Sequence, residues 1–336
     1  MINASQIKEH MEVKGADGKH VGTVDHVEGS RIKLTKSDPA SGGQHHYIGL
    51  DMVEEIKGDA VCLSKSADEA RRLEPCVSPN VRAALRFPSD VQVENRRLVA
   101  ALAASAEVHG VKLLTGVEVT SVLVERGRAR GVGTSRGAVR AGAVVVAAGA
   151  WSSLIRFEKV GPRAGGDVRE EAGAPCPPVE PVRGQMLCFE ARPPVVRHVV
   201  YSPRGYVVPR RDGRLLAGST TERAGYDKSV TGEGLRLVAA NAQEIAPAVG
   251  RLPLVDSWSG LRPRAPDGWP VLGAAEEVEN LYFATGHYRN GILLAPLTGE
   301  VVAARVAGGA APVAARALEA FAPGRFRRVA AGTNAR

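Results

Sequence analysis

A buried strand, a glycine-rich turn and a helix follow one another near the end of the chain, and this order most constrains the fold. Residues 281–284 form a short apolar run that predicts the strand, and residues 298–306 have the composition of a helix. The turn between them contains Gly286 and Gly291, with Arg289 in the middle. A helix that begins after such a turn offers unpaired amides and partial positive charge, and Arg289 adds a planar fork that suits a carboxylate. The stretch therefore predicts an α/β fold with an anion site at this turn.

A second stretch just upstream places more arginines among prolines and glycines. Residues 259–270 read Ser-Gly-Leu-Arg-Pro-Arg-Ala-Pro-Asp-Gly-Trp-Pro. Together, the two stretches resemble the C-terminal signature of the glycine oxidase and D-amino-acid oxidase family, closest to the glycine oxidases of thiamine biosynthesis. That signature contains Gly-Leu-Arg-Pro, then Asp-Gly-x-Pro, then Gly-His-x-Arg-Asn-Gly-Ile-Leu-Leu-Ala-Pro. This chain carries all three parts.

The composition excludes several classes of protein. The chain has 336 residues, 44% of them apolar, which is enough for one large or two modest domains. No apolar run reaches membrane-spanning length and the start shows no signal-peptide pattern, so we expect a cytoplasmic protein without membrane contact. The net charge of +8 is spread over single basic residues and aromatics are only 4%, which argues against nucleic-acid binding. The four cysteines lack metal-like or redox-like spacing, so we expect reduced thiols.

Charge is distributed unevenly along the chain. Residues 1–71 hold 7 lysines and 2 arginines against 12 acids, a net charge of −3, whereas residues 72–336 carry +11. Five of the eight histidines also lie in the first segment. Such a switch predicts two modules, residues 1–71 and 72–326, followed by a disordered tail at 327–336.

The first module has the pattern of a small all-β domain. We expect strands joined by turns at residues 12–27, 31–36, 46–48, 50–53 and 60–63. Many short strands of this kind predict a small barrel-like domain. Residues 13–27, 44–48 and 63–69 resemble the PRC-barrel-like family of small bacterial domains of unknown function. His45 and His46 are adjacent, so they point to opposite faces of a strand, and we predict no metal site.

The second module alternates helices and strands. We expect helices at residues 90–109 and 233–249, and strands at 111–114, 117–124, 131–134, 143–152, 205–210, 215–220 and 255–258. Leu98, Leu102 and Ala106 share one apolar face of the first helix. Residues 157–180 are rich in glycine, proline and charge and predict a connecting loop.

The family resemblance implies a particular fold and cofactor. The fold is a truncated two-dinucleotide-fold FAD oxidoreductase of the α/β (α+β) class, with an antiparallel sheet on the substrate side. The residues that the resemblance places at FAD are Val119, Gly149, Gly286, His287, Tyr288, Arg289, Asn290, Gly291, Ile292 and Leu293. Val119 contributes a backbone contact at the adenine end, and the amides after Gly286 face the flavin pyrimidine.

The resemblance also implies the reaction. FAD oxidises glycine or a small D- or secondary amino acid to an imine or 2-oxo acid, and molecular oxygen reoxidises the flavin to give hydrogen peroxide. Arg262 and Tyr206 bind the substrate carboxylate, and Arg289 lies at the flavin edge. Thr221 falls where some relatives have an apolar residue. The family implies a homo-oligomer that works with a thiazole synthase in thiamine biosynthesis.

One element of the family is missing from this chain. The family begins with a βαβ unit whose Gly-x-Gly-x-x-Gly motif seats the FAD diphosphate, and no such motif occurs here. The resemblance therefore covers only the C-terminal two thirds, and the central parallel sheet is expected to keep an unpaired edge. Two alternatives stay open: an inactive oxidase fragment behind a protein-binding N-terminal module, and a split enzyme whose nucleotide-binding half is another chain.

Overall fold

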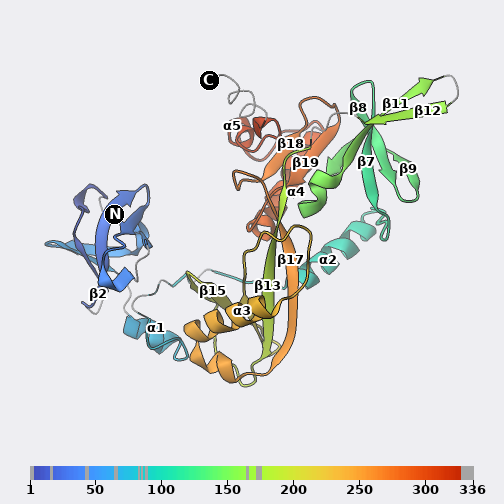
Figure 1. The fold of residues 1–336 in the computed structure, drawn as a ribbon. Coiled ribbons are helices and arrows are strands. Elements are labelled where there is room, and N and C mark those ends of the chain that lie inside the picture. The colour runs from blue at the N-terminus through green and yellow to red at the C-terminus, as the bar shows by residue number, and fades with distance from the viewer. Residues whose placement is uncertain are drawn as a thin grey trace. The chain divides into compact units, whose positions relative to one another are not determined.

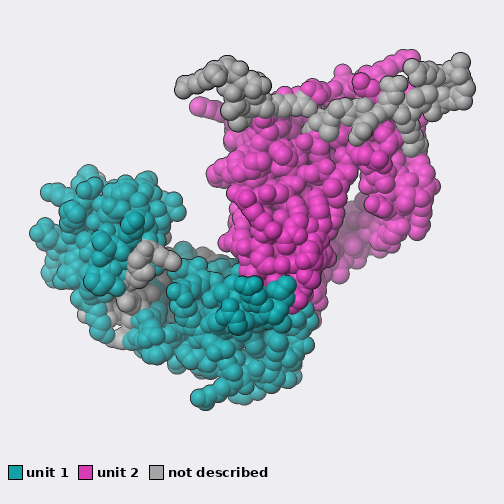
Figure 2. All heavy atoms as spheres, in the orientation of Figure 1, with its two compact units in different colours: residues 1–92, 186–219, 231–257 teal, residues 93–185, 220–230, 258–336 magenta. Residues whose placement is uncertain are grey.

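The fold was analysed in a computed structural model that describes residues 4–15, 18–41, 45–63, 67–81, 84, 86–87, 90–163, 166–171 and 176–326. The expected tail at 327–336 lies outside these residues. The chain divides into two compact units, shown in Figure 2. Unit 1 comprises residues 1–92, 186–219 and 231–257, and unit 2 comprises residues 93–185, 220–230 and 258–336.

The first part of unit 1 is an open sheet of six strands. These are β1 (Glu12–Lys14), β2 (His20–Glu28), β3 (Arg31–Leu34), β4 (Tyr47–Gly49), β5 (Val53–Lys57) and β6 (Ala60–Leu63), in the order β4-β3-β2-β1-β6-β5. Alternate apolar residues such as Val13, Val24 and Ile32 are fully buried, as period-two strands require. The predicted barrel is wrong, because β4 and β5 end the sheet without pairing with each other. Residues 50–52, expected in a strand, form the 3-10 helix η3 (Leu50–Met52).

The remainder of unit 1 packs a helix against antiparallel strands. The helices of this part are α1 (Ala67–Leu73), α3 (Gly232–Ile245) and the 3-10 helix η5 (Pro247–Arg251). The 3-10 helices η1 (Ala4–Gln6) and η2 (Pro39–Ser41) accompany the six-stranded sheet. The sheet has the order β14 (Val200–Ser202), β15 (Gly205–Pro209), β16 (Arg214–Gly218), β13 (Glu180–Glu190) and β17 (Leu254–Arg264). The part of β13 before Met186 and the part of β17 after Ser257 belong to unit 2. Val238 of α3 is buried with Leu187 and Leu215 of the strands. Val207 pairs with Ala217, which confirms the predicted hairpin.

Unit 2 contains two sheets around one core. The larger sheet has the order β12 (Gly166–Glu171), β11 (Arg156–Arg163), β7 (Val119–Glu125), β8 (Arg128–Thr134) and β9 (Gly137–Arg140). The smaller has the order β10 (Val144–Val146), β19 (Leu281–Thr285) and β18 (Val271–Ala274), with β10 parallel to β19. Val122 and Phe157 of the larger sheet share a core with Val146 and Phe283 of the smaller.

Three helical segments accompany these sheets. They are α2 (Asn95–Val108), α4 (Gly291–Val306) and α5 (Ala315–Glu319), with the 3-10 helix η4 (Gly149–Leu154) after β10. α4 lies beside β18 and β19 in Figure 1 and packs through Val301 against Leu272 and Leu318. It begins at Gly291 rather than at residue 298, so the expected turn is shorter. None of the helices in the described segments is both long and apolar enough to cross a membrane.

Other sequence predictions for unit 2 are corrected by long-range pairing. Residues 111–114 form no strand, and β10 covers only three residues, with Val145 40% exposed. The loop expected at 157–180 contains β11 and β12, because Arg156 and its neighbours pair in parallel with β7. α2 is a helix as predicted, but it has no buried residue, so its apolar face is not packed.

Candidate active site

The turn between β19 and α4 lies against the end of β17, which brings the two signature stretches together. Gly286 has φ of 72°, and Tyr288 also has a left-handed φ, of 48°. The Tyr288 amide donates a 2.7 Å hydrogen bond to the Pro263 carbonyl. Arg264 and His287 form an antiparallel bridge. The turn is therefore held against the end of β17 by backbone contacts.

Arg262 occupies a position that a glycine makes possible. Its Nη1 donates a 3.2 Å hydrogen bond to the Thr220 carbonyl. Its guanidinium lies against Gly184 of β13, where any β-carbon would overlap it. Gly184 thus sets where the Arg262 side chain can lie, and Arg262 is half-buried rather than extended into solvent.

Arg289 contacts Thr221, the residue that follows the Thr220 contacted by Arg262. Its Nη2 donates a 2.8 Å hydrogen bond to Thr221 Oγ1, and its guanidinium lies 5.3 Å from the centre of the Tyr288 ring. Among the described residues, no acidic side chain forms an ion pair with Arg289. Because Thr220 and Thr221 are adjacent, the structure brings Arg262 and Arg289 to one place in unit 2. Two nearby guanidinium groups suit a carboxylate ligand.

The sequence did not lead us to predict a network of charged and polar side chains that contacts Thr220. Arg183 Nε and Nη2 donate to Glu222 Oε2 at 3.0 and 2.5 Å, and its Nη1 donates to Asp227 at 2.6 Å. Gln185 is fully buried. Its side-chain Nε2 donates to Glu222 Oε1 at 2.9 Å, and its backbone amide donates to Thr220 Oγ1 at 2.8 Å. Arg183 and Gln185 are polar residues at alternate positions in the interior of β13 and both are buried, and that alternation is the signal that could have revealed them.

Glu222 is held in its ionised form by this network. Burial opposes ionisation of the Glu222 carboxyl, but hydrogen bonds from Thr220, Arg183 and Gln185 outweigh it and lower its pKa. The Glu222 hydrogen bond in turn raises the pKa of Arg183. The network therefore stays charged at neutral pH and fixes the segment that carries Thr220 and Thr221.

His287 is neutral at pH 7 and structural in its contacts. It is half-buried, and burial lowers its pKa below the usual value. Its Nε2 lies 2.9 Å from Thr298 Oγ1, about two turns into α4. This contact ties the turn to the helix, and the role of His287 at the cofactor stays a prediction.

Tyr206, the third predicted catalytic residue, belongs to unit 1. Its hydroxyl donates to Met186 Sδ at 3.3 Å, and its ring lies 5.1 Å from that of Tyr201. These contacts are described within unit 1, whereas Arg262 and Arg289 belong to unit 2. The role of Tyr206 at the substrate therefore stays a prediction.

The backbone at Gly149 fits the close approach of a flat cofactor ring. Gly149 has φ of 55°, and a β-carbon built there would meet no atom within 4 Å. Its carbonyl accepts hydrogen bonds from Thr285 Oγ1 at 3.0 Å and Ser152 Oγ at 2.8 Å. The glycine thus leaves open space beside a rigid backbone, as a bound ring requires.

The first turn of α4 leaves several amides for a ligand. The backbone hydrogen bonds of α4 begin with the Leu294 amide, which donates to the Asn290 carbonyl, and the Asn290 side chain does not cap the helix. The amides of Gly291, Ile292 and Leu293 therefore lack helical partners. They fit the end of a cofactor that becomes negatively charged on reduction.

Not every predicted cofactor residue takes part in this arrangement. The amides of Tyr288 and Asn290 are used by the carbonyls of Pro263 and His287, so they are not available to a flavin. Val119 begins β7 in the larger sheet with its side chain 40% exposed. None of the hydrogen bonds seen for the described residues joins the Val119 side of that sheet to Gly149.

The residues present fit only part of FAD. Gly149 and the first turn of α4 fit the flavin end. The diphosphate end has no counterpart, because the sequence lacks a Gly-x-Gly-x-x-Gly turn. The closest spacing, Gly131 and Gly133, lies inside β8, which is not followed by a helix.

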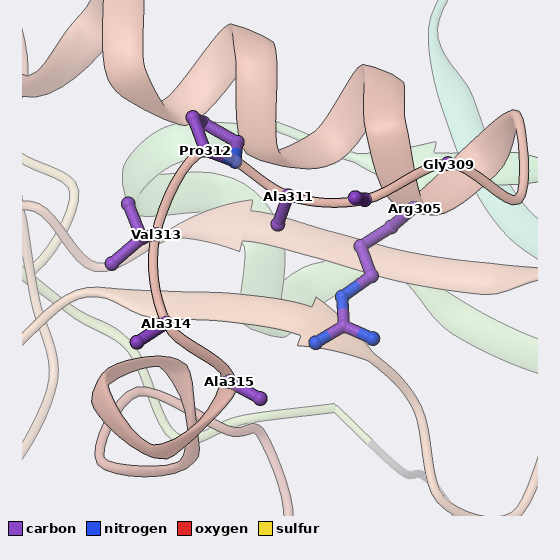
Figure 3. Close-up of a pocket in the computed structure, with 8 residues that line it drawn as sticks. Arg305, Gly309, Ala311, Pro312, Val313, Ala314 and Ala315 are labelled. Carbon is purple, nitrogen blue, oxygen red and sulfur yellow. The ribbon is translucent and has the colours of Figure 1, made fainter.

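A shallow pocket of about 400 Å³ lies elsewhere in unit 2. Figure 3 shows it between the end of α4 and α5, lined by Arg305 and residues 309–315. Apart from Arg305, its lining is made of alanine, glycine, proline and valine. None of the predicted site residues lines it, so it does not contribute to the candidate active site.

Comparison with known proteins identifies the family. Residues 50–305 match the family model DAO, described as FAD dependent oxidoreductase. The chain belongs to this FAD-dependent oxidoreductase family. Residues 7–71 match a second model, DUF2171, an uncharacterized protein conserved in bacteria. That description names no barrel, and the sheet is open, so the resemblance to PRC-barrel-like domains is not confirmed.

Three relatives show how the chain is similar to the family. It is 37% identical to the glycine oxidase of Pseudomonas putida over 75% of this chain and 68% of that protein. It is 35% identical to the bifunctional protein ThiO/ThiG of Synechocystis over 69% of this chain and 33% of that protein. The crystal structure of glycine oxidase from Geobacillus kaustophilus matches with a TM-score of 0.67 and 33% identity, over 77% of this chain and 66% of that chain. The chain thus spans about two thirds of the length of the glycine oxidases it matches.

Proposed function

We propose that this chain carries the substrate-side part of an FAD-dependent oxidase of glycine or a small D- or secondary amino acid. The observation that carries the proposal is the convergence of Arg262 and Arg289 on the adjacent residues Thr220 and Thr221. The similarity to glycine oxidases over three quarters of the chain supports it. In the net reaction, amino acid, oxygen and water give 2-oxo acid, hydrogen peroxide and ammonia, or a primary amine in place of ammonia when the amino acid is secondary.

The residues of the chain have separate roles in this proposal. Arg262, fixed against Gly184, binds the substrate carboxylate, and Tyr206 adds a hydroxyl donor. Arg289 binds at the ligand edge, held by Thr221. When bound, FAD supplies the hydride acceptor. No side-chain base is assigned, because an amine that binds in its neutral form needs none.

Wider features of the oxidase also remain proposals. The similarity to the bifunctional protein ThiO/ThiG supports cooperation with a thiazole synthase in thiamine biosynthesis. We also propose a cytoplasmic homo-oligomer, with the division between modules at residue 71. Each follows from the family rather than from a contact in the structure.

The first test is the visible absorption of the purified chain incubated with FAD, followed by peroxide release on addition of glycine. We expect an oxidised flavin spectrum that bleaches with glycine in the absence of oxygen. Arg262→Met serves as the variant that keeps flavin but loses turnover. Flavin that binds without bleaching, for glycine and for small D-amino acids alike, would show the proposal to be wrong.

A second function is favoured by the missing diphosphate turn. In this second proposal the chain is a catalytically dead or split oxidase fragment whose N-terminal module binds a protein. The match of residues 7–71 to an uncharacterized bacterial family supports a separate role for that module. Peroxide release that survives deletion of residues 1–71 would count against a binding function as the main role of the chain.

A further inference from the structure

The segment that follows β16 runs antiparallel to the unit 2 part of β13. Arg183 and Glu222 form the bridge between them, and the amide of each donates to the carbonyl of the other, at 2.9 and 3.0 Å. The side chains of this pair also meet, so they lie on one face. Neighbouring residues of an extended chain point to the opposite face, so Gly184 shares that second face with Thr221 and Arg223.

Two arginines of β17 lie on the same second face. Arg262 and Arg264 are two residues apart, so their side chains leave the strand in the same direction, about 7 Å apart along it. The Arg262 guanidinium lies against Gly184, and Arg264 Nη1 donates a 2.8 Å hydrogen bond to Glu180 Oε1. Gly184 and Glu180 both occupy even positions of β13, which agrees with the two arginines sharing a face.

Tyr288 brings a fourth arginine to this face. Its ring centre lies 5.9 Å from Arg264 Cζ and 5.3 Å from Arg289 Cζ, which is within the range of cation–π contacts. Arg289 also donates a hydrogen bond to Thr221, which lies on the same face. The name arginine face is used below for the group formed by Arg223, Arg262, Arg264 and Arg289.

The arginine face carries more positive than negative charge. Glu180 Oε1 lies 2.8 Å from Arg264 Nη1 and 3.8 Å from Arg223 Nη2, so two guanidinium groups share this carboxylate. In the described part of the chain, no second acid pairs with Arg223, Arg264 or Arg289. The Arg264 side chain is only 30% exposed, so solvent and salt screen its charge less than at the open surface. An anionic ligand therefore gains more here than at a solvated arginine.

A single carboxylate leaves part of this charge without a ligand. In the proposed function, the carboxylate of the amino acid binds Arg262. Arg264 gives one N–H group to Glu180 and keeps the rest of its planar fork for a ligand. A fork of this kind suits a second carboxylate, and a short molecule with two carboxylates reaches both arginines at once.

We propose that the preferred substrate is a short dicarboxylic amino acid, whose second carboxylate binds Arg264. Arg223 strengthens the positive field beside that carboxylate, and Glu180 holds the Arg264 guanidinium in place. This inference rests on the proposed function, because it takes Arg262 as the site of the first carboxylate. It selects, among small amino acids, those that carry a negative side chain.

The test compares two ligands of the same shape. D-Aspartate carries a second carboxylate, and D-asparagine carries a neutral amide in its place. Ligand-observed NMR titrations of the full chain, with and without FAD, measure both affinities, detect weak complexes and need no turnover. We expect D-aspartate to bind at least about tenfold more tightly, because charge-assisted hydrogen bonds are roughly twice as strong as neutral ones. Equal affinities would overturn the inference.

Two variants are expected to act in opposite directions. Arg264→Met removes the charge that binds the second carboxylate, so it should abolish most of the preference for D-aspartate. Glu180→Gln keeps an acceptor for Arg264 but removes a competing negative charge, so it should strengthen D-aspartate binding severalfold. An unchanged preference in Arg264→Met would overturn the assignment to this residue. The comparison of the two ligands in the wild-type chain decides the matter even if a variant does not fold.

Arg128→Met is the matched control. Arg128 lies in β8 and also pairs with a glutamate, because its Nη1 lies 2.9 Å from Glu279 Oε2. The variant therefore loses an arginine–glutamate pair of unit 2 outside the arginine face. It should keep the preference for D-aspartate, and a loss equal to that in Arg264→Met would show that the preference does not come from this face.

The outcomes separate this inference from the proposed oxidase. Preferential binding of D-aspartate without peroxide release in the presence of FAD supports the second carboxylate site and contradicts the oxidase. Glycine oxidation together with equal binding of the two ligands supports the oxidase and overturns the inference. Binding of neither ligand also overturns it. Inorganic phosphate that binds as tightly as D-aspartate would do the same, because the arginine face would then be a general anion site.

Discussion

Arg289 donates a hydrogen bond from Nη2 to Oγ1 of Thr221 at 2.8 Å. The neighbouring Thr220 carbonyl accepts one from Arg262 at 3.2 Å, so two arginines from different signature stretches meet on consecutive residues. Neither arginine is near this segment in the sequence. The convergence makes the identity of residue 221 important for how Arg289 meets a ligand.

Thr221→Val is expected to raise the KM for glycine about threefold to tenfold with little change in kcat. Valine keeps the shape of threonine but loses the acceptor for Arg289, and one such hydrogen bond contributes about 0.5–1.5 kcal/mol. The measurement is peroxide release from the chain incubated with FAD. Thr134→Val, which removes a hydroxyl contact to Gly137 in an exposed turn, is the control. An unchanged KM in Thr221→Val would remove Arg289 from the binding site.

Gly184→Ala is expected to lower kcat/KM for glycine about as much as Arg262→Lys, by roughly tenfold to a hundredfold. The added methyl group overlaps the Arg262 guanidinium and displaces it, whereas lysine loses the planar pair of donors. Gly142→Ala is the matched control, because a β-carbon there meets no atom within 4 Å. Full activity in Gly184→Ala would show that the position of Arg262 does not matter.

Glu222→Gln is expected to lower stability at neutral pH and to flatten its loss in acid. The folded-state pKa of Glu222 is lowered, so its stabilising effect is complete above the unfolded value of about 4.3 and is lost as pH falls through the folded value. Urea unfolding between pH 3 and pH 7 measures this, followed by tryptophan fluorescence. Parallel pH profiles for the wild-type protein and the variant would contradict the role given to the Arg183–Glu222 pair.

His287→Gln is expected to remove a decrease in stability on mild acidification. The pKa of His287 is lowered in the folded state, so the unfolded chain binds more protons below about pH 6.5. The free energy of unfolding of the wild-type protein therefore falls as pH decreases from 6.5 towards 5, and the variant should lack this component. His109→Gln, at the exposed end of α2, is the control and should keep the decrease.

Cys176 is expected to resist alkylation in the folded protein. Burial raises the pKa of its thiol to about 11, and its Sγ donates a 2.9 Å hydrogen bond to the Ser152 carbonyl. At pH 8 the thiolate population is then roughly a hundredfold smaller than for a free cysteine of pKa about 8.5. Mass spectrometry of the Cys176 peptide after iodoacetamide treatment, with and without urea, measures the ratio. Equal rates in the two conditions would mean that the thiol is exposed.

Patterns of neighbouring residues in the sequence predicted several helices and strands correctly. Period-two burial predicted β2 and β3, helical spacing predicted α3, and an apolar run flanked by turn residues predicted β19. Such patterns could not predict β11 and β12, because those strands are selected by pairing with β7. They also could not predict that α2 lacks packing, since the same amphipathic face fits a buried or an uncovered helix.

The sequence by itself determined the family signature, the absence of a diphosphate-binding turn and the chemistry of Arg262 and Arg289, because these depend on residue type and spacing along the chain. Only the tertiary structure decided that these arginines meet at Thr220 and Thr221 and that Arg183 and Gln185 hold Glu222 below them. It also decided that Val145 and Leu293 remain uncovered. Burial and convergence depend on which distant segments pack together, and that is settled by the summed contacts of the folded chain.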